Sequence, residues 1–152
     1  MKKFALFKLN EFCVANSIEY AVTGTTALSL LGVPTNLVPQ DIDIKVFHLT
    51  EEQAKKLKEL QFLSGLDDEE YDSGQCFSFI VCDIKINVLR SCTNCNDDNQ
   101  TVSINYIDEE HKKHHTIKVQ LVRQALADKM KLNRCKDKTY LIDLIKNLTS
   151  LV

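Results

Sequence analysis

Apolar and polar residues alternate with two different periods along this chain. Up to residue 63 the pattern switches between helical spacing and strict alternation. It predicts a helix over 3–16, a strand over 20–23, a helix over 25–31, a strand over 41–47 and a further helix to about residue 63. That last helix starts at a capping-box pattern, in which Thr50 is followed three positions later by Gln53.

From residue 76 the period changes to two. Strands are expected near 76–81, 83–90, 101–107 and 115–119, although the first two could also form one long strand. Helical spacing then returns near 120–134 and 138–149. This order predicts an α+β fold, a mixed β-sheet with helices packed on it. At 152 residues and 44% hydrophobic, the chain has enough material for one core, so we expect one domain over 1–152.

Two acidic residues stand out in the strand predicted over 41–47. Alternate side chains of a strand share one face, so Asp41 and Asp43 point to one side while Ile42 and Ile44 point to the other. Carboxylates held this close repel each other unless a cation lies between them, which indicates a divalent metal or a cationic partner. The alternative is a strand with one solvated face.

The segment 83–90 offers a third carboxylate. Asp83, Lys85 and Asn87 alternate there with apolar residues. Neighbouring strands lie about 5 Å apart, so Asp83 would join Asp41 and Asp43 if the two strands paired in a suitable register. The register itself is not readable from the sequence.

These residues resemble the motifs of the DNA polymerase β-like nucleotidyltransferase superfamily. The family pattern is an apolar residue, Gly-Gly/Ser, a helix, Asp-apolar-Asp/Glu-apolar and a later strand Asp; here Gly24-Thr25, Asp41/Asp43 and Asp83 match it. The match is strongest with small bacterial members, the toxin-type and antibiotic-modifying nucleotidyltransferases. A C-terminal helix of the toxin-like members is similar to a run of this chain that contains Lys129, Arg134, Asp137 and Asp143.

The resemblance implies an activity and a set of roles. The enzyme would move a nucleoside monophosphate from a triphosphate such as ATP to a hydroxyl acceptor. Asp41, Asp43 and Asp83 would be catalytic and would bind Mg²⁺, with two metal ions expected. Gly24 and Thr25 would approach the phosphates, and Lys129 would neutralise phosphate charge. The acceptor, whether RNA, protein or a small molecule, stays open.

Two features favour an alternative: Thr25 stands where Gly or Ser is usual, and the short chain leaves little room for an acceptor domain. The fifteen residues between Thr25 and Asp41 are also more than the common spacing of the pattern. The alternative is an inactive module of the same fold that binds nucleotide, RNA or a partner protein, such as a toxin- or antitoxin-like regulator. Lys129 also has a simpler interpretation, since a Lys beside an apolar stripe often only extends to solvent, and such a stripe is formed here by Val122, Ala125, Leu126 and Met130.

Composition and charge bear on the partners and the cellular location of the protein. With 19 basic and 21 acidic residues, the formal net charge is −2, so nothing global demands nucleic acid or a membrane surface. No apolar run approaches the roughly 20 residues of a membrane-spanning helix, and the N-terminal stretch mixes Lys, Asn and Glu into its apolar residues, unlike a signal peptide. We expect a cytoplasmic protein without membrane contact, and a homodimer is possible.

The cysteines offer one more hypothesis. In a chain without a secretion signal, six cysteines are expected to be reduced thiols. Cys92 and Cys95, followed by His111 and His115, also have the spacing of a zinc finger. The segment between them is patterned as a strand about 23 Å long, which would separate the two pairs. The histidine-rich stretch 111–115 is more simply a solvated hairpin tip.

Overall fold

The computed structural model describes residues 3–33, 40–66, 75–90, 101–132 and 135–150. In the first half of the chain, the elements are α1 (Lys3–Ala15), β1 (Glu19–Thr23), α2 (Gly24–Leu30), β2 (Ile42–Phe47) and α3 (Glu51–Leu63). In the second half, they are β3 (Gln75–Val81), β4 (Ile84–Arg90), β5 (Thr101–Asp108), β6 (Lys113–Gln120), α4 (Val122–Leu132) and α5 (Cys135–Ser150). The expected elements are therefore present, and the α+β prediction is confirmed.

The described strands form one six-stranded mixed sheet in the order β3-β4-β2-β1-β6-β5. β2 runs parallel to β4 and β1 runs parallel to β6, whereas the other neighbours are antiparallel. The segments near 76–81 and 83–90 are two strands, because Cys82 and Asp83 form a tight turn with φ of 48° and 65°. Positive φ at both central residues is typical of the two-residue turns that join hairpin strands.

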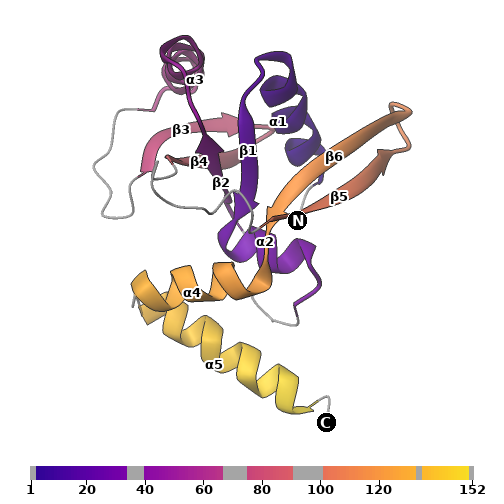
Figure 1. The fold of residues 1–152 in the computed structure, drawn as a ribbon, viewed down its shortest axis with the longest axis vertical. Coiled ribbons are helices and arrows are strands. Elements are labelled where there is room, and N and C mark those ends of the chain that lie inside the picture. Colours follow the sequence, from indigo (N-terminus) through magenta and orange to yellow (C-terminus); the bar gives the residue numbers. More distant parts are fainter. Residues whose placement is uncertain (1–2, 34–39, 67–74, 91–100, 133–134, 151–152) are drawn as a thin grey trace.

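Two groups of helices lie toward opposite ends of the long axis (Figure 1). α1 and α3 pack on one face of the sheet, where Leu6, Leu57, Ile44 and Ile86 share a core with no exposed surface. The capping box of Thr50 is present at the start of α3, as the sequence predicts.

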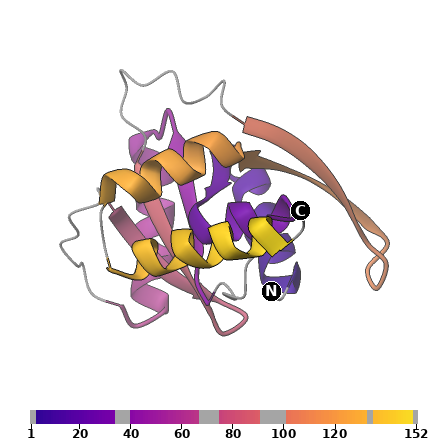
Figure 2. The ribbon, with the colours of Figure 1, turned by 90° about the horizontal axis from the view of Figure 1, so that it is seen from below.

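The second group of helices forms a smaller core. Leu28 of α2, Ala125 of α4, and Tyr140 and Leu144 of α5 pack together. α4 and α5 lie side by side across this part of the molecule (Figure 2). No helix in the described part of the chain is long and apolar enough to cross a membrane.

The hairpin of β5 and β6 lies beside α1 and extends away from α4 and α5 (Figures 1 and 2). Its turn lies at 109–112 and β6 begins at Lys113, so His111 is in the turn. His115 lies in β6 and is only 4% exposed. The expectation of a solvated tip therefore holds for His111 but is wrong for His115.

Candidate functional site

β2 separates polar from apolar side chains as the sequence predicts. Ile42 and Ile44 are buried in the core under α1 and α3. Asp43 points to the other face and is half-buried, while Asp41, directly before the strand, is exposed. The two carboxylates therefore lie at the beginning of β2, on the face away from the main core.

Gly24 brings backbone against the second carboxylate. Its φ is +66°, a conformation that other residues adopt only with strain, and a Cβ there would lie 3.0 Å from Oδ2 of Asp43. One residue on, Thr25 is half-buried; Thr26 then donates from its hydroxyl to the carbonyl oxygen of Asp41 at 2.9 Å. The turn from β1 into α2 thus packs directly on the start of β2, and a solvated strand face alone does not explain this contact.

Asn87 is the residue that strand pairing places beside Asp43. In the parallel pairing of β2 with β4, Asp43 is opposite Asn87. The amide nitrogen of Asn87 donates to Oδ1 of Asp43 at 2.9 Å and lies 3.4 Å from Oδ2 of Asp41. The site therefore contains two carboxylates and one amide from adjacent strands.

The structure does not bring Asp83 to this pair. Asp83 is exposed in the turn between β3 and β4, four residues before Asn87. Four strand residues span about 13 Å, so the register that places Asn87 at the carboxylates leaves Asp83 well short of them. The expected triad of Asp41, Asp43 and Asp83 is thus corrected to two aspartates and Asn87.

A polar network adjoins the carboxylates on the same face. Lys45 follows Asp43 by two positions, and its Nζ donates to Oδ2 of Asp128 in α4 at 3.1 Å. Gln120 donates its amide to the same oxygen at 3.0 Å, and accepts a hydrogen bond from the hydroxyl of Thr23. Thr23 in turn pairs with Asp43 in the antiparallel register of β1 and β2. The network thus links α4 to the strands that carry the site.

Asp128 and Gln120 were not predicted from the sequence. Asp128 lies next to Lys129 and resembles any surface carboxylate of a helix, although Gln124 one turn earlier, whose amide donates to its Oδ1 at 3.1 Å, is a weak local sign. Gln120 is the last residue of β6 and has no distinguishing pattern. Only the pairing of β1 with β6 places it beside Thr23.

The residues expected from the C-terminal helices are placed only in part. Lys129 lies in α4, but its side chain is outside the described residues, as are Arg134 and the side chain of Asp137. Asp143 is half-buried in α5. Of the apolar stripe, Val122 and Leu126 pack on the second core, whereas Met130 is 67% exposed, so its inclusion in that stripe is wrong.

The histidines do not form the zinc arrangement that their spacing allows. Nδ1 of His111 donates to Oδ2 of Asp108 at 2.9 Å, while Nδ1 of His115 accepts from the amide of Asn10 at 3.2 Å under α1. Cys92 and Cys95 lie outside the described residues. Among the residues that are described, no group of three or more His, Cys, Asp or Glu is arranged to hold a metal ion.

The carboxylate pair nevertheless fits a Mg²⁺ ion that a nucleotide would carry. Mg²⁺ prefers oxygen ligands, and at nucleotide sites it is usually bound by one or two carboxylates together with phosphate oxygens. Asp41 and Asp43 supply two carboxylates, and the lack of a side chain at Gly24 lets its backbone lie close to Asp43.

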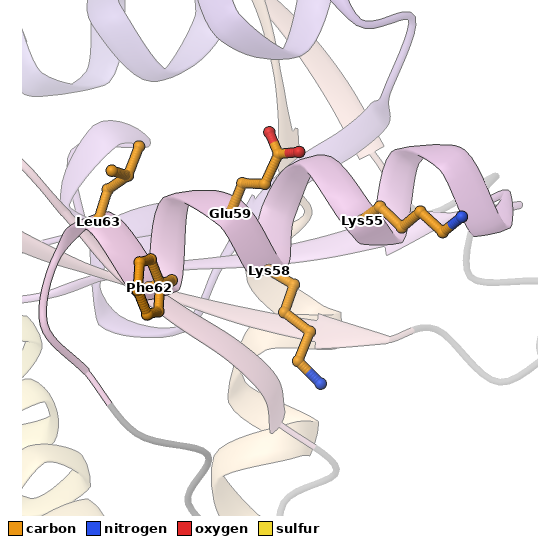
Figure 3. Close-up of a pocket in the computed structure, with 5 residues that line it drawn as sticks. All are labelled: Lys55, Lys58, Glu59, Phe62 and Leu63. Atoms are coloured by element: carbon orange, nitrogen blue, oxygen red, sulfur yellow. The ribbon is translucent and has the colours of Figure 1, made fainter.

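A separate hollow of about 530 Å³ runs along α3 and is lined by Lys55, Lys58, Glu59, Phe62 and Leu63 (Figure 3). Phe62 and Leu63 are 82% and 79% exposed there. α3 packs through Leu57 on the face of the sheet opposite to Asp43. The hollow is therefore not part of the carboxylate site.

Of the comparisons with known proteins, the one with solved structures identifies the fold. No protein-family model matches the chain, and no curated protein matches it. Among solved structures, a candidate nucleotidyltransferase from Thermotoga maritima superposes with a TM-score of 0.58 at 18% identity, covering 93% of this chain and 90% of the other. An antigenic nucleotidyltransferase-like protein from Paracoccidioides brasiliensis superposes with a TM-score of 0.59 at 16% identity, covering 94% and 73%. At these identities the likeness establishes a nucleotidyltransferase-like fold.

Proposed function

We propose that this chain moves a nucleoside monophosphate from a Mg²⁺-bound nucleoside triphosphate to a hydroxyl acceptor. The observation that carries the proposal is the contact between Gly24 and Asp43. Gly24 has no side chain, and a Cβ added there would lie only 3.0 Å from Oδ2 of Asp43. A phosphate needs such an open backbone surface, and a metal ion needs the adjacent carboxylates. The nucleotidyltransferase-like fold supports the same chemistry.

In the proposed reaction, the acceptor oxygen forms a bond to the α-phosphorus of the triphosphate. The bond from that phosphorus to the bridging oxygen breaks, pyrophosphate leaves and the hydroxyl proton is released. Bound Mg²⁺ would supply neutralisation of the phosphate charge. Asp41 and Asp43 hold the ion, and the hydrogen bond from Thr26 to the carbonyl of Asp41 keeps the first carboxylate near the turn at Gly24.

The test uses triphosphates labelled at the α-phosphate, supplied with Mg²⁺ and with RNA, protein and small molecules from a cell extract as acceptors. The near-isosteric variant Asp43→Asn keeps the shape of the site and removes one charge. As a matched control, Glu109→Gln removes a charge at the exposed β5–β6 turn. We expect label transfer by the wild type and by the control but not by Asp43→Asn. Equal transfer by all three proteins would refute the proposal.

One observation favours a second candidate, a module that binds a nucleotide without turnover. Asn87 lies at the place where a third carboxylate would be positioned, and a neutral amide does not accept the proton of an acceptor hydroxyl. In that case the wild type would bind the triphosphate with Mg²⁺, Asp43→Asn would not, and no label would be transferred to any acceptor. An RNA or a partner protein would then be a ligand of the module and not an acceptor in a reaction.

A further inference from the structure

The amide of Asn87 has a defined orientation. Its nitrogen points at the carboxylates, 2.9 Å from Asp43 and 3.4 Å from Asp41. Its oxygen accepts a hydrogen bond from the hydroxyl of Ser78 on β3 at 3.3 Å. Rotating the amide by half a turn would direct its oxygen at two carboxylates and remove both donor contacts, whereas the Ser78 hydroxyl can accept as well as donate and would fit either orientation. Asn87 therefore presents N–H donors, and no cation-binding oxygen, to the pair.

This orientation limits what the site can bind. Asp41 and Asp43 together carry a formal charge of −2, which one divalent cation balances. A second cation would require further oxygen ligands beside Asp43, and that side is occupied by the amide nitrogen. No third His, Cys, Asp or Glu completes a cluster there within the described ranges.

We infer that Asn87 makes this a single-cation site. Asp41 and Asp43 take the one divalent ion that accompanies the triphosphate, and the N–H donors of Asn87 offset the repulsion between the two carboxylates before that ion arrives. Asn87 is thus a positioning residue. The inference rests on the proposed function, since it assumes that a nucleotide brings the ion.

The register explains why position 87 has this effect. Asp43 is paired with Thr23 on one side and Asn87 on the other, so each neighbouring strand contributes one polar side chain next to it. Thr23 is held by Gln120, and Asn87 is held by Ser78. Of the two neighbours, Asn87 is the one that reaches both carboxylates, so a change of charge at this position acts directly on cation binding.

The variant Asn87→Asp tests the inference because it replaces the amide by an isosteric carboxylate. Mn²⁺ serves as the probe, with a non-hydrolysable triphosphate analogue, and the bound ions are counted by electron paramagnetic resonance and by isothermal titration calorimetry. We expect one Mn²⁺ per wild-type complex and two per variant complex. Without cation the variant should also melt at a lower temperature than the wild type, and Mn²⁺ should reverse this difference.

A matched control is Asn105→Asp on β5. Its side-chain oxygen accepts from Thr116 at 2.8 Å, a contact that a carboxylate preserves, so it adds the same charge away from the pair. One Mn²⁺ should bind to this control. If Asn87→Asp does not fold, Asn87→Ala replaces it and should bind one ion at least as tightly as the wild type, because the cation-free carboxylate pair loses the donors that offset its repulsion.

Three outcomes would overturn the inference. Two ions in the wild type would do so while leaving the proposed function intact, and one ion in a folded Asn87→Asp would do the same. Neither Mn²⁺ nor nucleotide bound by the wild type would overturn both. One bound ion in the wild type and two in the variant, without any label transfer, would support the inference and remove only the transfer step.

Discussion

Two clusters of polar side chains lie on opposite faces of the same sheet, and they differ in charge and in exposure to solvent. Under α1, the hydroxyl of Tyr20 donates to Asn10 at 2.6 Å, and Asn10 donates to Nδ1 of His115 at 3.2 Å. All three residues are buried and the cluster carries no formal charge. On the other face, one amide serves two carboxylates, and Asp41 is exposed.

The physical consequence is a division of roles. The two hydrogen bonds of the buried, neutral cluster stabilise the fold, although Nε2 of His115 is buried there without a hydrogen-bond partner. Burial raises the pKa of Tyr20, which keeps its hydroxyl protonated as a donor. The site of Asp41 and Asp43 has excess negative charge at the surface, which a cation would neutralise. We therefore assign stability to the closed cluster of Tyr20, Asn10 and His115, and ligand binding to the open cluster of Asp41, Asp43 and Asn87.

The most damaging way to break this comparison is Asn10→Ala. It leaves the hydroxyl of Tyr20 and Nδ1 of His115 buried without their partner, and each such group costs about 1–3 kcal/mol. We expect the free energy of unfolding to fall by about 3 kcal/mol and the melting temperature by roughly 6–12 °C. Urea denaturation and thermal scans would measure both.

Nucleotide binding by folded Asn10→Ala should match the wild type, because the change lies on the opposite face. The exposed Asn105→Ala is the control and should cost about 0.5 kcal/mol. A loss of nucleotide affinity in Asn10→Ala at a temperature where it is fully folded would contradict the division of roles.

Gly24→Ala breaks the open cluster, and Gly32→Ala is its matched control. Both glycines have positive φ, +66° and +76°, so an alanine at either position should cost about 1–2 kcal/mol in backbone strain. Only at Gly24 does the added Cβ meet Asp43, at 3.0 Å, whereas nothing lies within 4 Å of the Cβ at Gly32. Calorimetric titration should show nucleotide binding lost in Gly24→Ala and retained in Gly32→Ala. Equal binding by the two variants would show that this contact is irrelevant.

Lys45→Met sharpens the comparison by loosening the network that joins α4 to the site. The Lys45–Asp128 pair and the Lys113–Glu11 pair have the same length, 3.1 Å, but the lysine side chains are 18% and 54% exposed. Screening by water makes the exposed pair worth less, so Lys45→Met should cost about 1 kcal/mol and Lys113→Met clearly less. Chemical denaturation of the two variants would measure these losses of unfolding free energy. Equal losses would argue against a structural role for Asp128.

The smallest expected effect is on the pKa of Asp108, which is hydrogen-bonded to His111. This histidine is exposed at the turn of the hairpin, whereas His115 is buried. Burial alone would raise the pKa of Asp108, but hydrogen bonds from the ring and backbone of His111 outweigh it and hold that pKa below 3.8. A carboxyl with a lowered folded pKa stabilises the fold above its unfolded pKa, and this contribution disappears as the pH falls through the folded value.

The variant His111→Ala should therefore raise the pKa of Asp108 toward 3.8, as followed by nuclear magnetic resonance of its carboxyl carbon. The stability difference between wild type and variant should shrink below that pH. An unchanged Asp108 pKa in the variant would mean that the backbone hydrogen bond alone is responsible.

Much of the fold was predictable because it depends on local signals. The capping box at Thr50 and Gln53 marks the start of α3 in the sequence and in the structure. Period-two alternation placed Asp41 and Asp43 opposite Ile42 and Ile44 before any strand neighbour was known. Met130 fits the helical spacing of the apolar stripe but is exposed, because spacing alone does not define how far the surface that covers a helix extends.

The candidate site was predictable only within single strands. The alternation in 83–90 puts Asp83, Lys85 and Asn87 on one face, but it does not say which of them meets Asp43. Two residues of register, about 7 Å, separate each choice from the next. In the same way, His111 and His115 have the spacing of ligands, yet one lies in a turn and the other faces the core.

The sequence by itself determined the elements and the face on which the carboxylates stand, because these depend on the backbone within a few residues. Tertiary structure alone decided that Asn87 replaces Asp83 at the pair, and that Asp128 of α4 holds Lys45. Those contacts join residues more than 40 positions apart. They depend on strand register and helix docking, which follow from the packing of the whole core and leave no periodic trace in the chain.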